Sequence, residues 1–284
     1  MEIVETTARR ISASLGEIPQ PPKKLWMAGT LPPAGTKYLC VVGSRALTPY
    51  GRDVTARLIS GLAGHPISIV SGLALGADTQ AHRSALSAGL HTIAIPGSGL
   101  SEKAISPRSN LGLAKDIVAS GGLLVSEHPP EYLPHPYDFP SRNRIMVGMA
   151  DAVLMIEAGE KSGSLISARL AGEYGRELLC IPHRIGDANG FGSHLFLRLG
   201  ATLVTESSHI LEALRLTPTE SHTKPLPLLD ERELHMWTLL ETPKTKADLV
   251  RTSGLSAADT ITVLVTLDLK GMVKEEYGLW RRVF

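Results

Sequence analysis

The sequence has few cysteines and no long hydrophobic run. Its 284 residues include two cysteines, Cys40 and Cys180, each inside an apolar segment, so we expect reduced, buried thiols of a cytoplasmic protein. No apolar run approaches the roughly 18 residues needed to cross a bilayer. Residues 1–17 mix acidic and basic side chains and lack the apolar centre of a secretory signal. We therefore expect no membrane partner.

A strong excess of either charge is also missing. The chain has 29 basic and 28 acidic residues, whereas a protein that binds nucleic acid over its whole surface would be more basic. Any anion site must therefore be a local cluster. No cysteine or histidine spacing is typical of zinc, and we expect no metal and no other cofactor. The 43% of hydrophobic residues is too high for a disordered chain and can form a core.

Six short apolar or β-branched runs recur between residues 38 and 181. They are Tyr38–Val42, Ile67–Val70, Thr92–Ile95, Leu123–Val125, Ala152–Ile156 and Leu178–Ile181. Continuous runs of this kind are typical of parallel strands that are covered on both faces. Helical stretches separate them: Thr48 and Pro49 can start one, Asn110 can cap another, and Ser164 can start a third. This alternation predicts an α/β fold with a Rossmann-like, doubly wound, mostly parallel sheet.

The chain divides into segments of different composition. We expect a lead-in segment at 1–36, a Rossmann-like domain at 37–216 and a linker rich in proline, threonine and serine at 217–229. Residues 230–284 then predict three helices followed by a hairpin, with a cap at Ser256. Three helices followed by a hairpin indicate a small winged-helix domain.

Small and polar residues follow four of the predicted strands. They are Gly43, Ser44 and Arg45; Ser71 and Gly72; Gly97, Ser98 and Gly99; and Ser162, Gly163 and Ser164. Glycine lets a backbone approach a phosphate closely, and the N–H groups of the following helix attract it. Ligands of open α/β sheets bind outside the carboxyl ends of the strands. Although glycine is common in such turns, four loops of this kind on one edge favour a phosphate-rich ligand.

The segment from Phe139 to Ile145 adds an aromatic ring beside two arginines. A base could stack on Phe139 while Arg142 or Arg144, on either side of Asn143, meets a phosphate. Arginine near a helix N-terminus is unfavourable unless an anion lies there. The alternative is an ion pair with a glutamate or aspartate of the protein.

We expect structural roles for several other polar residues. Asp78 and His82 lie four residues apart on one helix face, but they lack a third orienting group and an obvious nucleophile. We interpret them as a capping aspartate and a hydrogen-bonded histidine. Glu127 is expected to be structural, and the role of Glu157 stays open.

Several motifs together resemble the DNA-processing protein A family, also called DprA or Smf. They are VVGSRALTPYG at 41–51, IVSGLALGADTQAH at 69–82, PGSGL at 96–100, and SEHPPEYLPHPYDFPSRNRIMVGMADAVLMIEA followed by SGSLISARLAGEYGREL, which end at Leu178. The resemblance covers roughly residues 15–214, and the C-terminal residues look like the family's winged helix. It implies a Rossmann-like protein that binds single-stranded DNA, forms a homodimer and helps to load the RecA recombinase during natural transformation. It also implies that the chain is not an enzyme.

The chain departs from the family pattern at four places. Leu75 stands where the family usually has arginine, and His135 and Pro136 stand where many members have lysine. Pro182-His183 and Gly192-Ser193-His194 replace a Pro-Gly and a Gly-x-Asn element. The family's N-terminal helical domain is missing or reduced to about 14 residues. The first three departures concern DNA affinity more than the fold.

Two further expectations concern a rival function of the Rossmann-like domain and the partner of the C-terminal domain. The alternative to a DNA-binding mediator is a Rossmann-like sensor of a nucleotide ligand, or a nucleotide N-glycosidase. Residues 225–284 hold eight basic and nine acidic residues, and the expected recognition helix at 257–269 has no basic residue. Because duplex readers need basic or amide side chains on that helix, we expect this domain to contact protein.

Overall fold

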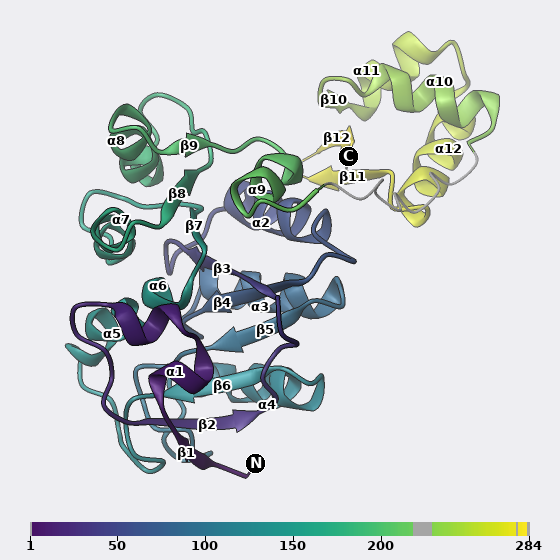
Figure 1. Ribbon diagram of the computed structural model, residues 1–284. Coiled ribbons are helices and arrows are strands. Elements are labelled where there is room, and N and C mark those ends of the chain that lie inside the picture. Colours follow the sequence, from purple (N-terminus) through teal and green to yellow (C-terminus); the bar gives the residue numbers. More distant parts are fainter. Residues whose placement is uncertain (1, 218–228, 277, 283–284) are drawn as a thin grey trace. The chain divides into compact units, whose positions relative to one another are not determined.

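The computed structural model describes residues 2–217, 229–276 and 278–282 (Figure 1). The chain forms two compact units, Met1–Thr219 and Glu220–Phe284, called here the large and the small unit. The predicted linker at 217–229 lies almost wholly outside the described residues.

A mixed sheet runs through the described part of the large unit. Its nine strands lie in the order β1-β2-β6-β5-β4-β3-β7-β8-β9. They are β1 (Val4–Thr6), β2 (Leu25–Gly29), β3 (Lys37–Val42), β4 (Ile67–Ser71), β5 (His91–Ala94), β6 (Leu123–Ser126), β7 (Ala152–Met155), β8 (Glu177–Cys180) and β9 (Thr202–Leu203). The strands from β6 to β9 pair in parallel, which confirms the Rossmann-like, mostly parallel α/β sheet.

Residues before position 37 belong to the same sheet. Strand β2 pairs antiparallel with β6, and β1 pairs antiparallel with β2. Between them lie α1 (Ala8–Ile11) and the 3-10 turn η1 (Ser14–Glu17). Ile11 and Leu15 of this connection are buried in the core beneath α6 (Asn143–Met149). The lead-in segment therefore completes one face of the large unit.

Helices cover both faces of the sheet (Figure 1). One face packs on α2 (Pro49–Ser60), α3 (Ala77–Ser87), α4 (Leu111–Ala119) and α9 (Ser207–Ala213). The other packs on α6, α7 (Ser164–Glu173) and α8 (Phe191–Arg198). The continuous apolar strands are explained by this double cover, because both of their faces are buried.

The helix starts follow the sequence signals with one exception. Thr48 Oγ1 accepts a hydrogen bond from Gly51 N at 3.1 Å, and Pro49 is the first residue of α2. Asn110 precedes α4, but the expectation that its side chain caps this helix is wrong. Asn110 lies in the 3-10 turn η2 (Arg108–Asn110), and its Nδ2 donates instead to Leu73 O and Thr79 Oγ1, each at 2.8 Å.

Both cysteines are free and buried, as the sequence predicts. Burial raises the pKa of the Cys180 thiol to about 12 and raises the pKa of Cys40 as well. Both thiols therefore stay protonated at neutral pH. Among the described helices, none is long and apolar enough to span a membrane.

The small unit contains the three helices and the hairpin that we expected, together with a short strand between the first two helices that we did not expect. It contains α10 (Glu231–Leu239), β10 (Lys244–Thr245), α11 (Lys246–Ser253), α12 (Ala257–Leu269), β11 (Val273–Glu276) and β12 (Leu279–Arg282). The strands pair antiparallel in the order β10-β12-β11. Met236, Leu264 and Trp280 are buried in its core. The winged-helix assignment stays a prediction for this unit.

Candidate nucleic-acid interface

The loop after β3 lies against the start of α3. Ser44 O accepts a hydrogen bond from Ala77 N at 3.0 Å, and Ser44 Oγ accepts one from Ala46 N at 3.1 Å. A Cβ on Gly43 would lie 2.6 Å from Ala77 Cβ, so glycine is needed for this approach. Arg45, the next residue, is exposed. The loops after β3 and β4 therefore meet at one edge of the sheet.

The loop after β4 is held by its own aspartate. Gly72 N and Ala74 N donate to Asp78 Oδ2 at 3.1 and 3.2 Å. Ser71 Oγ donates to Val41 O at 2.7 Å. Asp78 lies in the first turn of α3 and holds the preceding loop without capping the helix, so its role is structural but is not the expected cap. The polar groups of Ser71 and Gly72 are engaged within the protein.

The same loop contains two left-handed residues. Gly76 has a φ of 75°, and a Cβ on it would lie 2.3 Å from Ser44 O and 2.5 Å from Arg45 O. Leu73 has a φ of 61°, which a non-glycine residue rarely adopts and which stores strain. Leu75 between them is 48% exposed. The conformation of this loop and the position of Arg45 are therefore linked.

Residues 97–99, after β5, are buried. Ser98 O accepts from Ser126 Oγ at 2.7 Å, and Gly99 N donates to Tyr132 O at 2.9 Å. A Cβ on Gly97 would lie 3.0 Å from Phe139 Cδ1, whereas one on Gly99 would meet the backbone of residues 129–130. Gly99 therefore allows a loop of the chain itself, residues 128–137, to pack on the sheet edge, and Gly97 allows the approach of Phe139.

Phe139 and Arg45 come together from distant parts of the sequence. Phe139 lies in the short helix α5 (Asp138–Ser141) and is half-buried. Arg45 Cζ lies over its ring, 5.2 Å from the centroid, within the range of a cation–π contact. In the described part of the chain, no carboxylate lies within ion-pair distance of Arg45. An aromatic surface and an unneutralised guanidinium therefore lie side by side at the sheet edge.

The other two arginines of this segment form ion pairs within the protein. Arg142 is buried, with Nη2 3.4 Å from Asp78 Oδ2. Arg144 Nη2 lies 2.6 Å from both carboxylate oxygens of Glu127. Asn143, between them, is also buried. This is the alternative that the sequence left open, and burial lowers the pKa of Arg142 although Asp78 opposes that effect.

Residues 162–164 lie after β7, the strand beside β3 in the sheet. Ser162 Oγ donates to Ser164 Oγ at 3.1 Å and accepts from Ser164 N at 3.3 Å. Gly163 is exposed, and a Cβ on it would meet nothing within 4 Å. This loop opens α7 and presents exposed backbone on the same edge.

Glu157 and His82 have structural positions. The Glu157 carboxylate is buried and accepts from Thr48 N and Asn189 Nδ2, each at 3.1 Å, so it fixes the start of α2. His82 is fully buried, and its Nδ1 lies 2.8 Å from Thr92 Oγ1. Burial lowers the pKa of His82 to about 4. His82 is therefore the hydrogen-bonded core histidine that we expected.

The histidines that depart from the family pattern make contacts to the backbone. His183 Nε2 lies 2.9 Å from Ile156 O, and His194 Nε2 lies 3.1 Å from His183 O. Tyr50 approaches His183 edge-on and donates its hydroxyl to Pro182 O at 2.7 Å. These contacts fasten the loop after β8 to the start of α2.

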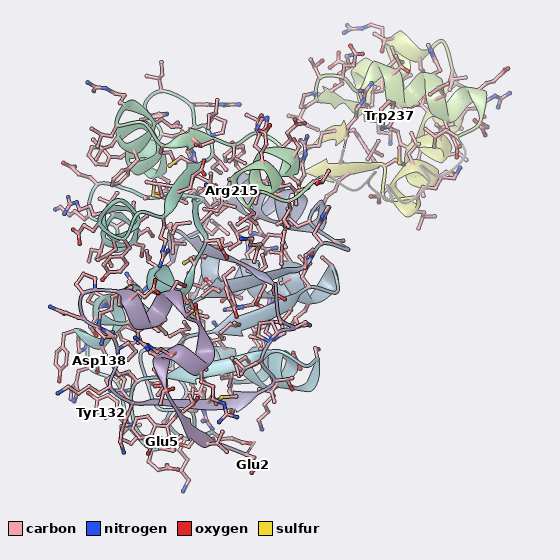
Figure 2. The ribbon with its side chains drawn as sticks, viewed as in Figure 1. Glu2, Glu5, Tyr132, Asp138, Arg215 and Trp237 are labelled. Atoms are coloured by element: carbon pink, nitrogen blue, oxygen red, sulfur yellow. The ribbon has the colours of Figure 1, made fainter. Side chains whose placement is uncertain are left out.

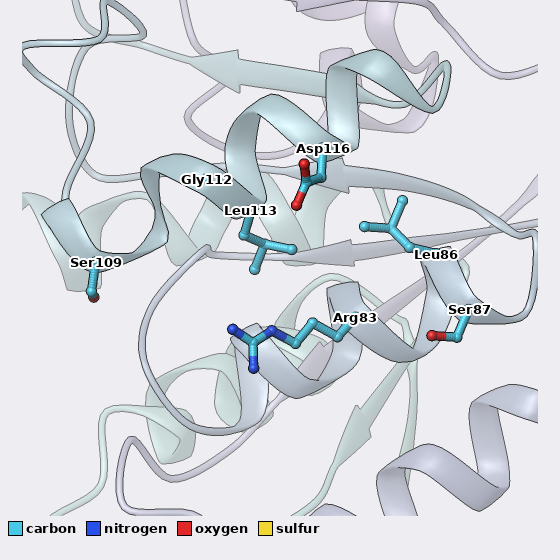
Figure 3. Close-up of a pocket in the computed structure, with 7 residues that line it drawn as sticks. All are labelled: Arg83, Leu86, Ser87, Ser109, Gly112, Leu113 and Asp116. Carbon is cyan, nitrogen blue, oxygen red and sulfur yellow. The ribbon is translucent and has the colours of Figure 1, made fainter.

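A hollow of about 450 Å³ lies between α3 and α4 (Figure 3). Arg83, Leu86 and Leu113 line it, with the side chain of Arg83 directed into the space. None of the predicted site residues lines this hollow. Among the described residues, no cluster of histidine, cysteine, aspartate or glutamate could hold a metal ion.

The doubly wound sheet, its glycine loops and the Arg45–Phe139 contact define a Rossmann-like protein with a candidate nucleic-acid edge. A family model described as DNA recombination-mediator protein A matches residues 2–215. The chain therefore belongs to the DprA/Smf family of recombination mediators, which confirms the resemblance found in the sequence.

The relatives extend over most of the chain. Protein Smf of Escherichia coli is 36% identical over 275 residues, which cover 92% of this chain and 72% of the relative. The crystal structure of DprA from Streptococcus pneumoniae matches with a TM-score of 0.69 and 36% identity over 75% of this chain and 74% of that one. A DprA structure from Helicobacter pylori, described by its single-stranded DNA binding mode, has a TM-score of 0.65 and 29% identity over 76% of this chain and 96% of that one.

Proposed function

We propose that this chain binds single-stranded DNA at the carboxyl edge of its sheet and helps to load RecA on incoming strands during natural transformation. The single observation that carries the proposal is the position of Arg45 over Phe139. A single strand needs a ring on which a base can stack and a cation beside it for the phosphate. Membership of a recombination-mediator family supports this assignment.

The residues of the proposed interface divide by exposure. Arg45, Phe139, Ser162 and Gly163 present exposed or half-exposed groups at the edge. Ser71, Gly72, Ser98, Arg142 and Arg144 hold the loops through the internal contacts described above. We therefore assign direct DNA contact to the first set and positioning to the second.

We also propose that the chain has no catalytic activity. Asp78 and His82 are the pair most similar to a catalytic dyad, but Asp78 accepts two backbone N–H groups and His82 faces Thr92 in the core. This favours a binding protein over a nucleotide N-glycosidase.

Binding of labelled oligo-dT, followed by electrophoretic shift, tests the proposal against its rival. The proposal predicts a shifted complex with oligo-dT and no release of base from AMP when the same samples are analysed by HPLC. Absence of a shift, combined with base release or tight binding of a mononucleotide, would assign the edge to a nucleotide ligand instead.

The open end of the sheet supports a homodimer. Strand β9 is the last strand of the described sheet, and Leu203 on it is 48% exposed. Leu199, just before it, is 71% exposed. Light scattering should report a dimer for the natural chain and a smaller mass for the double variant Leu199→Glu, Leu203→Glu. An unchanged mass would place the contact elsewhere.

We propose that the small unit contacts protein and not duplex DNA. Ile261, Val265 and Leu269 on α12 are 38%, 46% and 84% exposed at four-residue spacing. The hydroxyls of Thr262 and Thr266 on the same helix donate to backbone carbonyls within it, so they do not offer donors to a base. A truncation after Leu216 should keep single-strand binding and change the oligomer mass. Loss of DNA binding by a folded truncation of unchanged oligomeric state would contradict this.

A further inference from the structure

Four aromatic side chains stack in pairs on the loop of residues 128–137, called here the aromatic loop. The rings of His128 and Tyr132 are nearly parallel, with an 8° interplanar angle and centroids 4.1 Å apart. The rings of His135 and Tyr137 make a 9° angle at 5.3 Å. Tyr132 also meets His135 edge-on at 6.1 Å. The four rings therefore form an array of two stacked pairs that meet edge-on.

A buried carboxylate fixes the aromatic loop. Asp138 is 3% exposed and accepts from Tyr132 Oη at 3.0 Å and from His135 N at 2.7 Å. Figure 2 shows Tyr132 and Asp138 together at one end of the large unit. Burial and the hydrogen bond to Asp138 raise the pKa of Tyr132 to about 12, so its hydroxyl stays a donor. The array is therefore held in place before any ligand arrives.

The aromatic loop is also tied to the sheet edge. Gly99 N donates to Tyr132 O, and Ser101 N donates to Pro130 O, each at 2.9 Å. The loop therefore continues the edge that carries Arg45 and Phe139, and Tyr137 lies two residues before Phe139.

The outer end of the array is exposed. Tyr137 is 65% exposed although one face of its ring lies on His135, and Leu133 is 64% exposed. A ring that is already fixed binds a flat partner more tightly than a mobile ring does, because less conformational freedom is lost on binding. Bases are flat, and every base can stack on an aromatic ring regardless of sequence.

We propose that Tyr137 and His135 form a second stacking platform, which holds the bases of single-stranded DNA next to the base on Phe139. This inference rests on the proposed function of the edge. The aromatic loop has an exposed Glu131 and no lysine or arginine, so its contribution comes from stacking and not from phosphate contacts. Loss of the platform should therefore weaken binding without changing its salt dependence, unlike loss of Arg45.

The test compares the natural chain with Tyr137→Ala, Tyr137→Leu and Tyr137→Phe on labelled oligo-dT and on the same oligomer with abasic sites. Tyr174→Ala is the matched control, because Tyr174 is a half-buried tyrosine at the C-terminal end of α7, the end opposite to the 162–164 loop. Thermal unfolding of each variant shows that the fold is kept.

The proposal predicts that Tyr137→Ala and Tyr137→Leu weaken oligo-dT binding by about 5- to 150-fold, as when one base–aromatic stack is lost. Tyr137→Phe should bind as the natural chain does, and the slope against salt should stay the same. The variants should bind the abasic oligomer as tightly as the natural chain.

Equal oligo-dT affinity for Tyr137→Ala and the natural chain would overturn the platform while leaving the proposed function intact. An equal loss on the abasic oligomer would also overturn it and would assign the loop to backbone contact or to a protein partner. Failure of the natural chain to bind oligo-dT at all would overturn both proposals together.

Discussion

The guanidinium of Arg45 lies over the ring of Phe139, with Cζ 5.2 Å from the ring centroid. The contact joins the loop after β3 to α5, and the strands β4, β5 and β6 lie between these two segments in the sequence. Arg142 and Arg144 are paired with Asp78 and Glu127, so of these three arginines Arg45 is the one that can meet a phosphate.

Replacement of Arg45 by alanine should weaken oligo-dT binding. If Arg45 neutralises one phosphate, the slope of log affinity against log salt should fall by about 0.7, the value for one contact on a single strand. Titrations at several salt concentrations measure this slope. Arg83→Ala is a suitable control, because Arg83 is exposed on α3 beside the hollow and away from the edge. An unchanged slope and affinity for Arg45→Ala would remove Arg45 from the interface.

Replacement of Phe139 by alanine should cost roughly 1–3 kcal/mol in single-strand affinity, because one stacked base loses its support. Unfolding should stay cooperative, since Phe139 is only half-buried. Phe191→Ala, at a 40% exposed phenylalanine on α8, controls for loss of an aromatic side chain. If Phe139→Ala mainly lowers the melting temperature and leaves affinity unchanged, the ring serves packing and not DNA.

Replacement of Gly76 by alanine should displace the loop that carries Arg45. The new Cβ would lie 2.3 Å from Ser44 O, in a backbone conformation that side chains rarely adopt, at a cost of about 1–3 kcal/mol in stability. We expect lower stability together with weaker oligo-dT binding. Gly112→Ala, within α4 and with nothing within 4 Å of the added Cβ, should leave binding unchanged. Full binding by Gly76→Ala would show that this loop does not position Arg45.

His82 should make the large unit less stable in acid. Burial lowers its pKa from 6.5 to about 4, so below pH 6.5 the unfolded chain binds a proton that the folded chain does not. The His82 contribution to the free energy of unfolding is therefore complete above about pH 6.5 and falls by about 3 kcal/mol as the pH decreases to 4.

Calorimetry of the natural chain and His82→Gln between pH 7 and pH 4.5 measures this effect. The variant should lose less stability over that range, whereas His235→Gln, at an exposed histidine of the small unit, should behave like the natural chain. The same acid loss in His82→Gln and the natural chain would show that another group causes it.

The parallel sheet could be predicted because its strands leave a strong local signal. Strands such as β3 and β7 are continuous apolar runs, buried on both faces. Strand β1 has three residues and β9 has two, and so short a run carries no periodic signal. Strand β2 is held by antiparallel pairing with β6, a contact between residues almost 100 positions apart that no local pattern contains.

Only part of the candidate site could be predicted from the sequence. Glycine-rich loops at the sheet edge were expected. Glycine allows the close approach of a ligand or of another part of the backbone, and here Gly97 lies against Phe139 of α5 and Gly99 against the aromatic loop. Two arginines were expected near a phosphate, yet the acids that pair with them lie 64 and 17 residues away. Tyr132 and Tyr137 were not predicted as site residues, although the segment HPPEYLPHPYDF is rich in aromatic side chains and could have indicated a stacking surface.

The most direct test of the account is the affinity of the natural chain for a fluorescent oligo-dT and for a duplex of the same length, measured by anisotropy over a range of salt concentrations. The account predicts tighter binding of the single strand at every salt concentration, with log affinity falling linearly as log salt rises. Equal or tighter binding of the duplex, or no binding of the single strand at low salt, would contradict it.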